Sequence, residues 1–292
     1  MIDLLYLWRR RYWRFDRQAH QRLPSGQPAT VVTGASDGLG RSLAKSFAKD
    51  GNRLVLIARH EAGLLDTARE IAALGAPEPI ILPLDITRPE AVERIAARLE
   101  TEGLYIDVLI NCAGIGQAGA FASAPPDRLD AMIALNITAL SQLMRHALPD
   151  MLVRGRGGVL NIGSLGGMVP GPNQAAYYAS KAYVILLTKA VAQECKGKGV
   201  RVSVAAPGPI ETKFHERMGA KRSVYHQMGL TLRPETAARD IRYGYWLGLT
   251  VIVPGILPFL LWPFARFTPH WITAPLMKVL LGTRVKQEEH KA

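Results

Sequence analysis

The chain has 292 residues, which suits one large α/β domain, alone or with an appendage. Its hydrophobic content of 48% is ample for a core, and its net charge of +12 suggests anionic partners such as phosphate groups or an anionic membrane surface. No long arginine run interleaved with aromatic residues crosses the core, so a nucleic acid is not expected as a partner. Cys112 and Cys195 lie far apart without metal-ligand spacing, which argues against a disulfide framework or a metal site and fits a reducing, cytoplasmic compartment.

The N-terminal segment, residues 1–28, mixes arginines with aromatic residues in "LYLWRRRYWRFDR". The apolar run before the arginines is too short for a signal peptide, and the charges follow it, so secretion is not expected. Two interpretations remain open: an interfacial anchor with its arginines on anionic lipid, and a terminal helix packed on the domain. Proline and glycine between residues 24 and 28 predict a linker into the main domain, residues 29–240.

The start of that domain predicts a site for a diphosphate. "ATVVTGASDGLG" combines a β-branched strand, a glycine-rich turn and the beginning of a helix. Gly34, Gly38 and Gly40 would let the backbone approach an anion, and the free N–H groups and dipole of the helix would face it. The spacing differs from G-x-G-x-x-G, so the interpretation depends on the position of the turn directly after a strand.

The next two strands predict where an adenosine group would lie. The strand over residues 53–59 ends at Arg59, in the place where a carboxylate selects NAD and an arginine accommodates the 2′-phosphate of NADP. The sequence therefore predicts NADP(H) over NAD(H), unless Arg59 is only a solvated strand-end residue. The strand over residues 80–84 ends at Asp85, which either receives the adenine amino group or only caps its turn.

The following strand and helix add residues that could lie against a cofactor. "IDVLINCAG" ends with Asn111, Ala113 and Gly114, which let a cofactor approach the backbone. Asn136 stands among apolar helix residues, either as a satisfied core amide or as a functional group. The alternation of strands and helices predicts a doubly wound parallel sheet with its ligand at the carboxyl ends of the strands.

A serine, a tyrosine and a lysine then indicate chemistry. Ser164 ends the strand "GGVLNIGS", and Tyr177 and Lys181 lie four residues apart on a helix predicted over residues 173–195. Positions i and i+4 share a helix face, so the ammonium can lower the pKa of the phenol from about 10. Such a tyrosine can exchange a proton with a substrate oxygen that Ser164 holds. The trio suits carbonyl reduction or alcohol oxidation, although a Tyr–Lys pair alone is usually a solvated pair.

In their order and spacing, "TGASDGLG", "NCAG", the helix asparagine, Ser164, "YYASK" and "PGPIET" resemble the short-chain dehydrogenase/reductase family over residues 29–235. The resemblance implies a Rossmann fold in which Tyr177 donates and accepts the proton. It implies that Lys181 lowers the pKa of the tyrosine and holds the nicotinamide ribose. It further implies that Ser164 positions the carbonyl oxygen and that Asn136 supports a water relay to Lys181.

The cofactor contacts are expected from the strand ends and from the resemblance. They are Gly34, Ser36, Gly38, Leu39, Gly40, Arg59, Asp85, Asn111, Ala113, Gly114, Tyr177, Lys181, Pro207, Gly208 and Thr212. Three features depart from or complicate the pattern. Cys112 replaces a second asparagine that many members have, and Tyr178 adjoins the tyrosine but lacks a lysine four residues on. Asp37 brings a carboxylate near the cofactor phosphates, which weighs against NADP.

The last segment, residues 241–292, is apolar. Residues 243–265 carry no charge over 23 positions, long enough to span a membrane, but three prolines argue against one straight spanning helix. "LTVIVPG" resembles the last core strand of the family. This leaves "ILPFLLWPFARF" as a short apolar hairpin or helix that contacts a membrane or packs in a dimer.

The sequence therefore predicts an NADP-dependent oxidoreductase acting on a carbonyl or secondary alcohol. An apolar substrate is expected because Met218, Tyr225, Met228 and Leu230 fall where the family places its substrate lid. A homo-oligomer and peripheral membrane contact through the termini are further expectations. The alternative is a catalytically silent nucleotide-binding sensor or scaffold, against which the intact trio argues.

Overall fold

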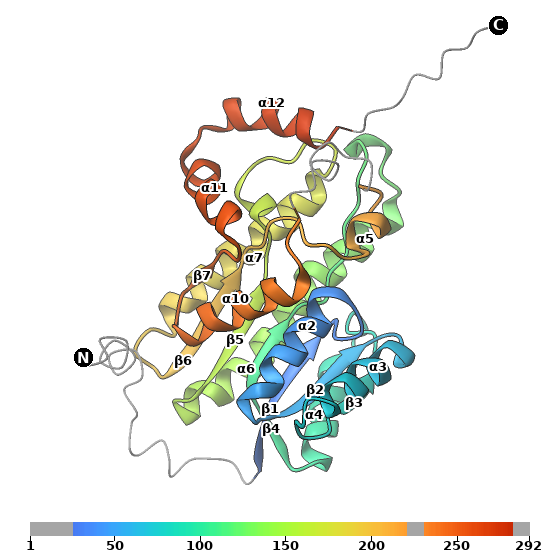
Figure 1. Ribbon diagram of the computed structural model, residues 1–292, viewed down its shortest axis with the longest axis vertical. Helices are drawn as coiled ribbons and strands as arrows, with labels where there is room; N and C mark the ends of the chain where they lie inside the picture. Colours follow the sequence, from blue (N-terminus) through green and yellow to red (C-terminus); the bar gives the residue numbers. More distant parts are fainter. Residues whose placement is uncertain (1–25, 221–230, 283–292) are drawn as a thin grey trace, which may run out of the picture.

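The computed structural model describes residues 26–220 and 231–282 (Figure 1). The expectations for the N-terminal segment and for Tyr225, Met228 and Leu230 therefore lie outside the described residues. Seven parallel strands form one sheet in the order β3-β2-β1-β4-β5-β6-β7. Their bounds are β1 Gln27–Thr33, β2 Arg53–Ala58, β3 Ile80–Pro83, β4 Leu104–Asn111, β5 Gly157–Ile162, β6 Val200–Ala205 and β7 Val251–Ile252. The predicted doubly wound parallel sheet is confirmed.

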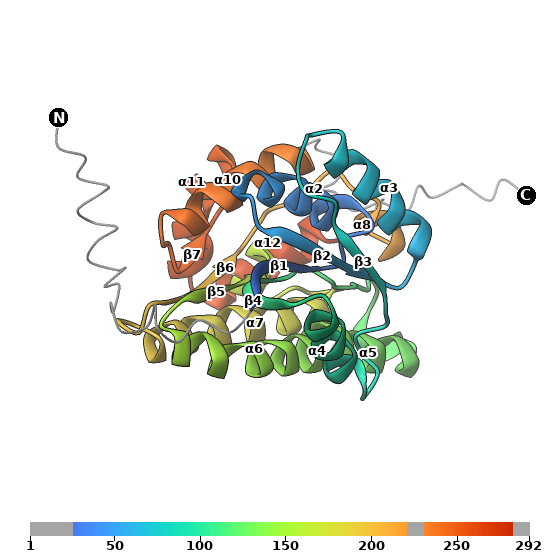
Figure 2. The same cartoon turned by 90° about the horizontal axis from the view of Figure 1, so that it is seen from below.

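Helices cover both faces of the sheet, and Figure 2, seen from below the view of Figure 1, shows the sheet between two layers of helices. One face carries α2 Gly38–Phe47, α3 Glu61–Ala72 and α10 Pro234–Trp246. The other carries α4 Ala91–Thr101, α6 Leu140–Arg154 and α7 Ala175–Glu194, with α5 Pro126–Ile133 beyond them. These helices are the crossovers that parallel strands require.

The core follows the two-residue period of the strands. Leu109 packs with α4 and α6 in one buried cluster, while its neighbour Ile110 packs with α2 and α10 in the other. Val31 and Val32 divide in the same way, and all four side chains are completely buried. Strands buried on both faces show continuous apolar runs, which is why these segments could be identified from sequence.

The order of the strands fixes the position of the ligand crevice. The chain winds outward from β1 to β3 and then returns to β4 on the other side of β1, so the connections diverge between β1 and β4. The two backbones come close there, since a Cβ on Gly34 would lie 2.9 Å from the Cα of Ala113. In doubly wound sheets, ligands bind at this switch point, outside the carboxyl ends of the strands.

The C-terminal part of the chain completes the fold. Asp50 accepts hydrogen bonds from Arg242 and from Trp246 Nε1, the latter at 3.0 Å, and these fasten α10 to the end of α2. The predicted last strand is β7, which pairs with β6. The boundary expected between residues 240 and 241 falls inside α10, a single helix.

Beyond β7, the apolar segment is helical: α11 spans Ile256–Phe267 and α12 spans His270–Leu280. Both lie over the carboxyl-end edge of the sheet (Figure 1). Within residues 26–220 and 231–282, no helix combines the length and apolar character needed to cross a bilayer.

Candidate active site

A cleft of about 1450 Å³ runs along the carboxyl ends of the strands. Nearly all predicted site residues line it. They are Gly34, Ser36, Gly38, Leu39, Gly40, Arg59, Asp85, Ala113, Gly114, Ser164, Tyr177, Lys181, Pro207, Gly208 and Thr212. Asn111 and Asn136 do not line it. The topology therefore gathers residues that are far apart in the sequence along a single edge.

The glycine turn is wound tightly against the N-terminus of α2. Gly34 and Gly38 have φ values of 69° and 53°, which side chains rarely adopt. A Cβ on Gly40 would overlap the carbonyl oxygen of Gly34. Asp37 caps the helix, its Oδ1 accepting a hydrogen bond from Gly38 N at 2.8 Å. This shape suits a diphosphate, which needs close backbone approach and the positive end of a helix dipole.

The Asp37 carboxylate also has a cationic partner. Arg217, at the end of the short helix α8 Phe214–Arg217, donates to its second oxygen at 2.7 Å. The segment after β6 thus reaches back over the glycine turn, where Thr212 lies against Gly38. The Asp37 carboxylate, which by its charge weighs against NADP, is therefore paired with the Arg217 guanidinium.

The residues expected at the adenosine group line the cleft beside the glycine turn, where Ala35 N donates to the carbonyl oxygen of Ile57 on β2. Arg59 is exposed at the end of β2. Asp85 accepts hydrogen bonds from the backbone N–H of Thr87 at 3.0 Å and from its hydroxyl at 2.7 Å, so it does cap its turn. Partial burial raises the pKa of Asp85, but these hydrogen bonds and the charges of Arg59 and Arg88 outweigh it and hold the pKa below its usual value. A contact with adenine stays a prediction.

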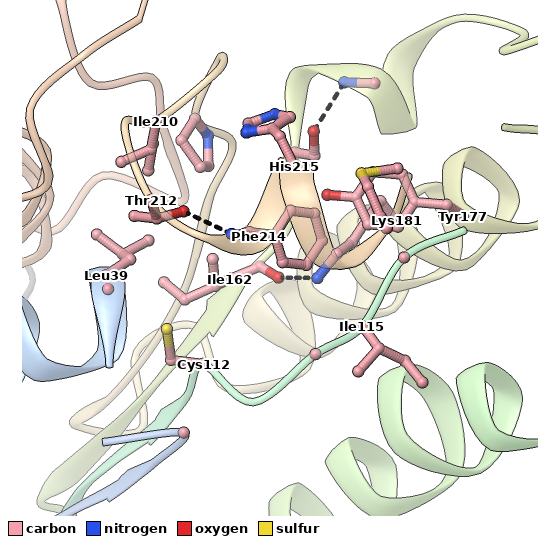
Figure 3. Close-up of a pocket in the computed structure, with 18 of the residues that line it drawn as sticks. Leu39, Cys112, Ile115, Ile162, Tyr177, Lys181, Ile210, Thr212, Phe214 and His215 are labelled. Atoms are coloured by element: carbon pink, nitrogen blue, oxygen red, sulfur yellow. Dashed lines mark hydrogen bonds between the residues drawn. The ribbon is translucent and has the colours of Figure 1, made fainter. Parts of the chain in front are cut away.

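Lys181 is buried in the lining of the cleft, and Figure 3 shows it beside Tyr177 and Ile162. Its Nζ donates to the carbonyl oxygen of Ile162 at 2.9 Å and lies 5.9 Å from the centroid of the Tyr177 ring. Burial lowers the pKa of Lys181 to about 8, with the neighbouring Cys112 acting in the opposite direction. Burial raises the pKa of the Cys112 thiol to about 12, so the thiol stays protonated. A cation thus lies close to the tyrosine at neutral pH.

The two adjacent tyrosines have different surroundings. The Tyr177 ring packs against that of Phe214, with their centroids 5.6 Å apart (Figure 3). Tyr178 is buried beneath the loop before α7, so closely that a Cβ on Gly171 would overlap its ring. Tyr177 is the one that shares its helix face with Lys181. Tyr178 instead fixes the loop to the helix.

Ser164 is held in place by the turn that it begins. It caps a short 3₁₀ helix, Leu165–Met168, and its Oγ accepts a hydrogen bond from Gly166 N at 3.1 Å. The N–H of Leu165 donates to the carbonyl oxygen of Pro207 at 3.0 Å, which ties this turn to the end of β6. The Ser164 hydroxyl accepts here, so its own hydrogen can be donated to a substrate oxygen.

Asn136 is a positioning residue beneath the cleft. It is 1% exposed in a π-helical turn, Ala134–Ala139. Its Oδ1 accepts from Ile115 N at 3.0 Å, and its Nδ2 donates to Ile115 O at 2.9 Å and to Ser180 Oγ at 3.1 Å. It therefore clamps the loop after β4 to α7. A Cβ on Gly114 would lie 3.2 Å from Asn136 Oδ1 and 3.4 Å from Lys181 Nζ, so this glycine keeps the group compact.

Asn111 points away from the cleft. It is 3% exposed, and its Nδ2 donates to Asn161 Oδ1 at 2.9 Å. Asn161 in turn donates to Thr188 on α7 at 2.9 Å. The structure thus places the Asn111 side chain in a buried polar chain between sheet and helix, away from the cleft lining. A contact between the cofactor and the backbone at Asn111 stays a prediction.

Sequence reasoning missed several residues of the cleft. Gln174, three residues before Tyr177, lines the cleft at 3% exposure, and its Nε2 has no hydrogen-bond partner among the described residues. One wall comes from α8, α11 and α12 through Phe214, Leu261 and Leu276. The apolar composition of these segments was the available signal. No group of three His, Cys, Asp or Glu residues in the described ranges could hold a metal ion.

Comparison with known proteins decides the family. The family profile described as short chain dehydrogenase matches residues 28–223. The chain belongs to the short-chain dehydrogenase family. It is 35% identical over 218 residues to an uncharacterized short-chain type dehydrogenase/reductase, y4eK, of Sinorhizobium fredii, covering 73% of this chain and 83% of that one.

Other members of the short-chain dehydrogenase family match over less of their length. The very-long-chain 3-oxoacyl-CoA reductase of Anas platyrhynchos is 38% identical, over 63% of this chain and 60% of its own. The probable oxidoreductase EphD of Mycobacterium tuberculosis is 36% identical over 65% of this chain and 32% of its own, so this chain spans about a third of that relative.

Solved short-chain dehydrogenases share most of the fold. The enzyme of Sphingobium yanoikuyae in complex with NADPH has a TM-score of 0.73 at 27% identity, covering 90% of this chain and 98% of that one. A 3-ketoacyl-(acyl-carrier-protein) reductase from Brucella melitensis complexed with NADH has a TM-score of 0.68 at 29% identity, covering 78% and 96%. The chain thus shares its family and fold with oxidoreductases whose solved complexes hold NADPH or NADH.

Proposed function

We propose that the protein is an NADPH-dependent reductase of a carbonyl group in an apolar substrate, with Tyr177 as the proton donor. The observation that carries the proposal is the position of Lys181. Its buried ammonium lies 5.9 Å from the centroid of the Tyr177 ring, on the same cleft as Ser164. A buried cation there favours a phenol that gives up its proton.

The residues of the cleft fit a dinucleotide. The glycine turn suits the diphosphate, and Arg59 is the guanidinium available at the strand end for a 2′-phosphate. Arg217 pairs with the Asp37 carboxylate, which would otherwise repel the cofactor phosphates. The NADPH complex of a similar enzyme supports the choice of cofactor, whereas the NADH complex of another makes a direct comparison necessary.

When bound, the nicotinamide supplies a hydride to the substrate carbon in reduction and accepts one in oxidation. In reduction, Ser164 donates a hydrogen bond to the carbonyl oxygen, and Tyr177 transfers its phenolic proton to that oxygen. The C=O double bond becomes a C–OH group, and the phenolate left behind is stabilised by the Lys181 ammonium. Asn136 holds the loop after β4 and the helix α7, which flank Lys181. With these two segments fixed, a water relay could return a proton from solvent to Lys181.

The substrate preference rests on the apolar wall of the cleft to which α8, α11 and α12 contribute. Phe214, Met218, Leu261 and Leu276 present apolar side chains to the cleft. Gln174 is a buried polar group beside the tyrosine, and its amide can orient a substrate oxygen. One relative is named a very-long-chain 3-oxoacyl-CoA reductase, and a long acyl chain is an apolar substrate.

A homo-oligomer through the exposed side of α7, at Tyr183 and Leu186, is a further expectation that sedimentation velocity would test.

The first test is a fluorescence titration of the purified protein with NADPH and NADH. Wild type is expected to bind NADPH more tightly, and Arg59→Ala to lose about tenfold in affinity for NADPH only. Arg94→Ala removes an equally charged exposed residue that does not line the cleft and should change neither affinity. Equal binding of both cofactors by wild type would contradict the choice of NADP(H).

The second test is turnover. Tyr177→Phe should lower kcat for reduction of an apolar ketone by about 10²–10⁴-fold while NADPH still binds. Tyr178→Phe removes the same atom from the neighbouring ring and should keep most of the activity. If wild type binds NADPH but turns over no ketone or alcohol, the sensor or scaffold interpretation would replace the proposal.

A further inference from the structure

The outward faces of α11 and α12 are apolar and exposed. The side chains concerned are exposed by 60% to 82%, and they are Ile256, Phe259, Leu260, Phe267, Trp271 and Val279, here called the outer apolar face. On α11, positions 256, 259, 260 and 267 fall within one side of a helix. Soluble monomers rarely expose a large apolar patch without a binding role, so this face needs an occupant.

The outer apolar face continues into the cleft. Leu257, Leu261, Phe264 and Leu276 line the cleft and are nevertheless exposed by 42% to 50%. These four residues therefore form a rim between the interior of the cleft and the outside of the two helices. An apolar molecule could pass over this rim without crossing a polar surface. The same helices thus provide the wall of the cleft and the exposed face.

The charge of the segment identifies the occupant. No Asp or Glu occurs between Asp240 and Glu288, while Arg266 and Lys278 lie within α11 and α12. A segment whose sequence combines Trp, Phe and Leu with basic residues and no acid matches the headgroup region of an anionic bilayer. A second copy of this chain, with its net charge of +12, would bring like charge to the same face.

The lengths of the helices fix how the segment meets a bilayer. α11 has 12 residues and α12 has 11, each with an internal proline, whereas a spanning helix needs about 20 residues. Two short helices with one apolar side lie along the interface instead of crossing it. In that orientation, the rim of the cleft faces the acyl chains.

We propose that α11 and α12 dock the enzyme on an anionic membrane surface and that the apolar substrate enters the cleft from the bilayer between them. The docking stands on the exposed face and its charge alone. The entry route rests on the proposed function, because it requires an apolar carbonyl substrate that dissolves in lipid.

The docking is tested by co-sedimentation of the full chain with vesicles of phosphatidylcholine, with and without phosphatidylglycerol. Phe259→Ser/Phe267→Ser alters the outer apolar face without touching a cleft residue. Leu74→Ser/Phe121→Ser is the matched control, since these side chains are 53% and 61% exposed elsewhere. Wild type and control should bind the phosphatidylglycerol vesicles alike, and the outer-face variant should lose at least about tenfold in partitioning.

Two results would overturn the docking. Equal vesicle binding by the outer-face variant would assign the contact to another part of the chain. A smaller sedimentation coefficient for that variant in the absence of vesicles would show that a second copy covers the face.

The entry route is tested by comparing two ketones, one dissolved in the vesicles and one soluble in water. The outer-face variant should lose rate at least fivefold for the vesicle-held ketone only. Full NADPH-dependent reduction of the soluble ketone then shows that the proposed function holds independently. An unchanged rate for the vesicle-held ketone, or an equal fall for both ketones, would overturn the route.

Discussion

Arg217 donates to the Asp37 carboxylate at 2.7 Å, across 180 residues of sequence, and joins the segment after β6 to the glycine turn. The Arg217 side chain is 64% exposed and that of Asp37 is 39% exposed, so solvent screens the pair and it contributes little to stability. Its place beside the turn gives it another role. A carboxylate next to a cofactor diphosphate repels it unless a cation is paired with it.

The first prediction follows from this pair. Arg217→Ala should weaken NADPH binding by about two- to fivefold, because the carboxylate is left uncompensated. Asp37→Asn in the same background should restore the affinity, since asparagine caps a helix as well as aspartate but carries no charge. Fluorescence titration measures both, with melting temperatures as the control for folding. If Arg217→Ala alone bound NADPH as tightly as wild type does, the ion pair would have no effect on cofactor binding.

A pH dependence follows from Lys181. Burial disfavours its ammonium form and lowers its pKa from 10.5 to about 8. The value of kcat/KM for NADPH reports the free enzyme, and it should fall as pH rises through about 8, when the lysine loses its proton. Bound NADPH is an anion and favours the ammonium, so the fall in kcat should come at higher pH. Lys181→Met should lack this inflection and have low activity throughout.

The same shift predicts the sign of a change in stability. The lysine of the unfolded chain keeps its ordinary pKa, so between about pH 8 and 10.5 the unfolded state binds more protons than the folded state. The contribution of Lys181 to the free energy of unfolding should therefore rise with pH across that range. Denaturant titrations of wild type and Lys181→Met measure it as the difference between the two proteins. A difference that falls with pH would contradict the burial of this ammonium.

The sequence was sufficient to predict the sheet and the meeting of Ser164, Tyr177 and Lys181. Buried parallel strands have continuous apolar runs, and their carboxyl ends necessarily meet at one edge. The direction of the Asn111 side chain was not predictable in this way, because it depends on which face of β4 that residue occupies. The partner of Asp37 was hidden because an exposed ion pair between distant segments leaves no local pattern.

The packing of the glycine turn predicts a severe effect of one methyl group. Gly40→Ala would place its Cβ on the carbonyl oxygen of Gly34, which is backbone and cannot move aside. The turn must open, so NADPH binding should weaken at least about tenfold. Gly51→Ala is the control, because no atom lies within 4 Å of its added methyl group and only its φ of 81° is strained. That variant should lose about 1 kcal/mol of stability and bind normally; equal effects of the two would refute a role for the packing.

The two buried asparagines should separate stability from catalysis. Asn111→Ala leaves Asn161 Oδ1 without its partner and should lower the free energy of unfolding by about 1–3 kcal/mol, with NADPH affinity and kcat unchanged. Asn136→Ala removes the same amide but releases Ile115 from α7, so it should also lower kcat. Because the clamp helps to keep Lys181 away from water, its loss should move the inflection near pH 8 upward, toward the ordinary lysine value. A fall in stability without a shifted pH profile would mean that Asn136 acts only on the fold.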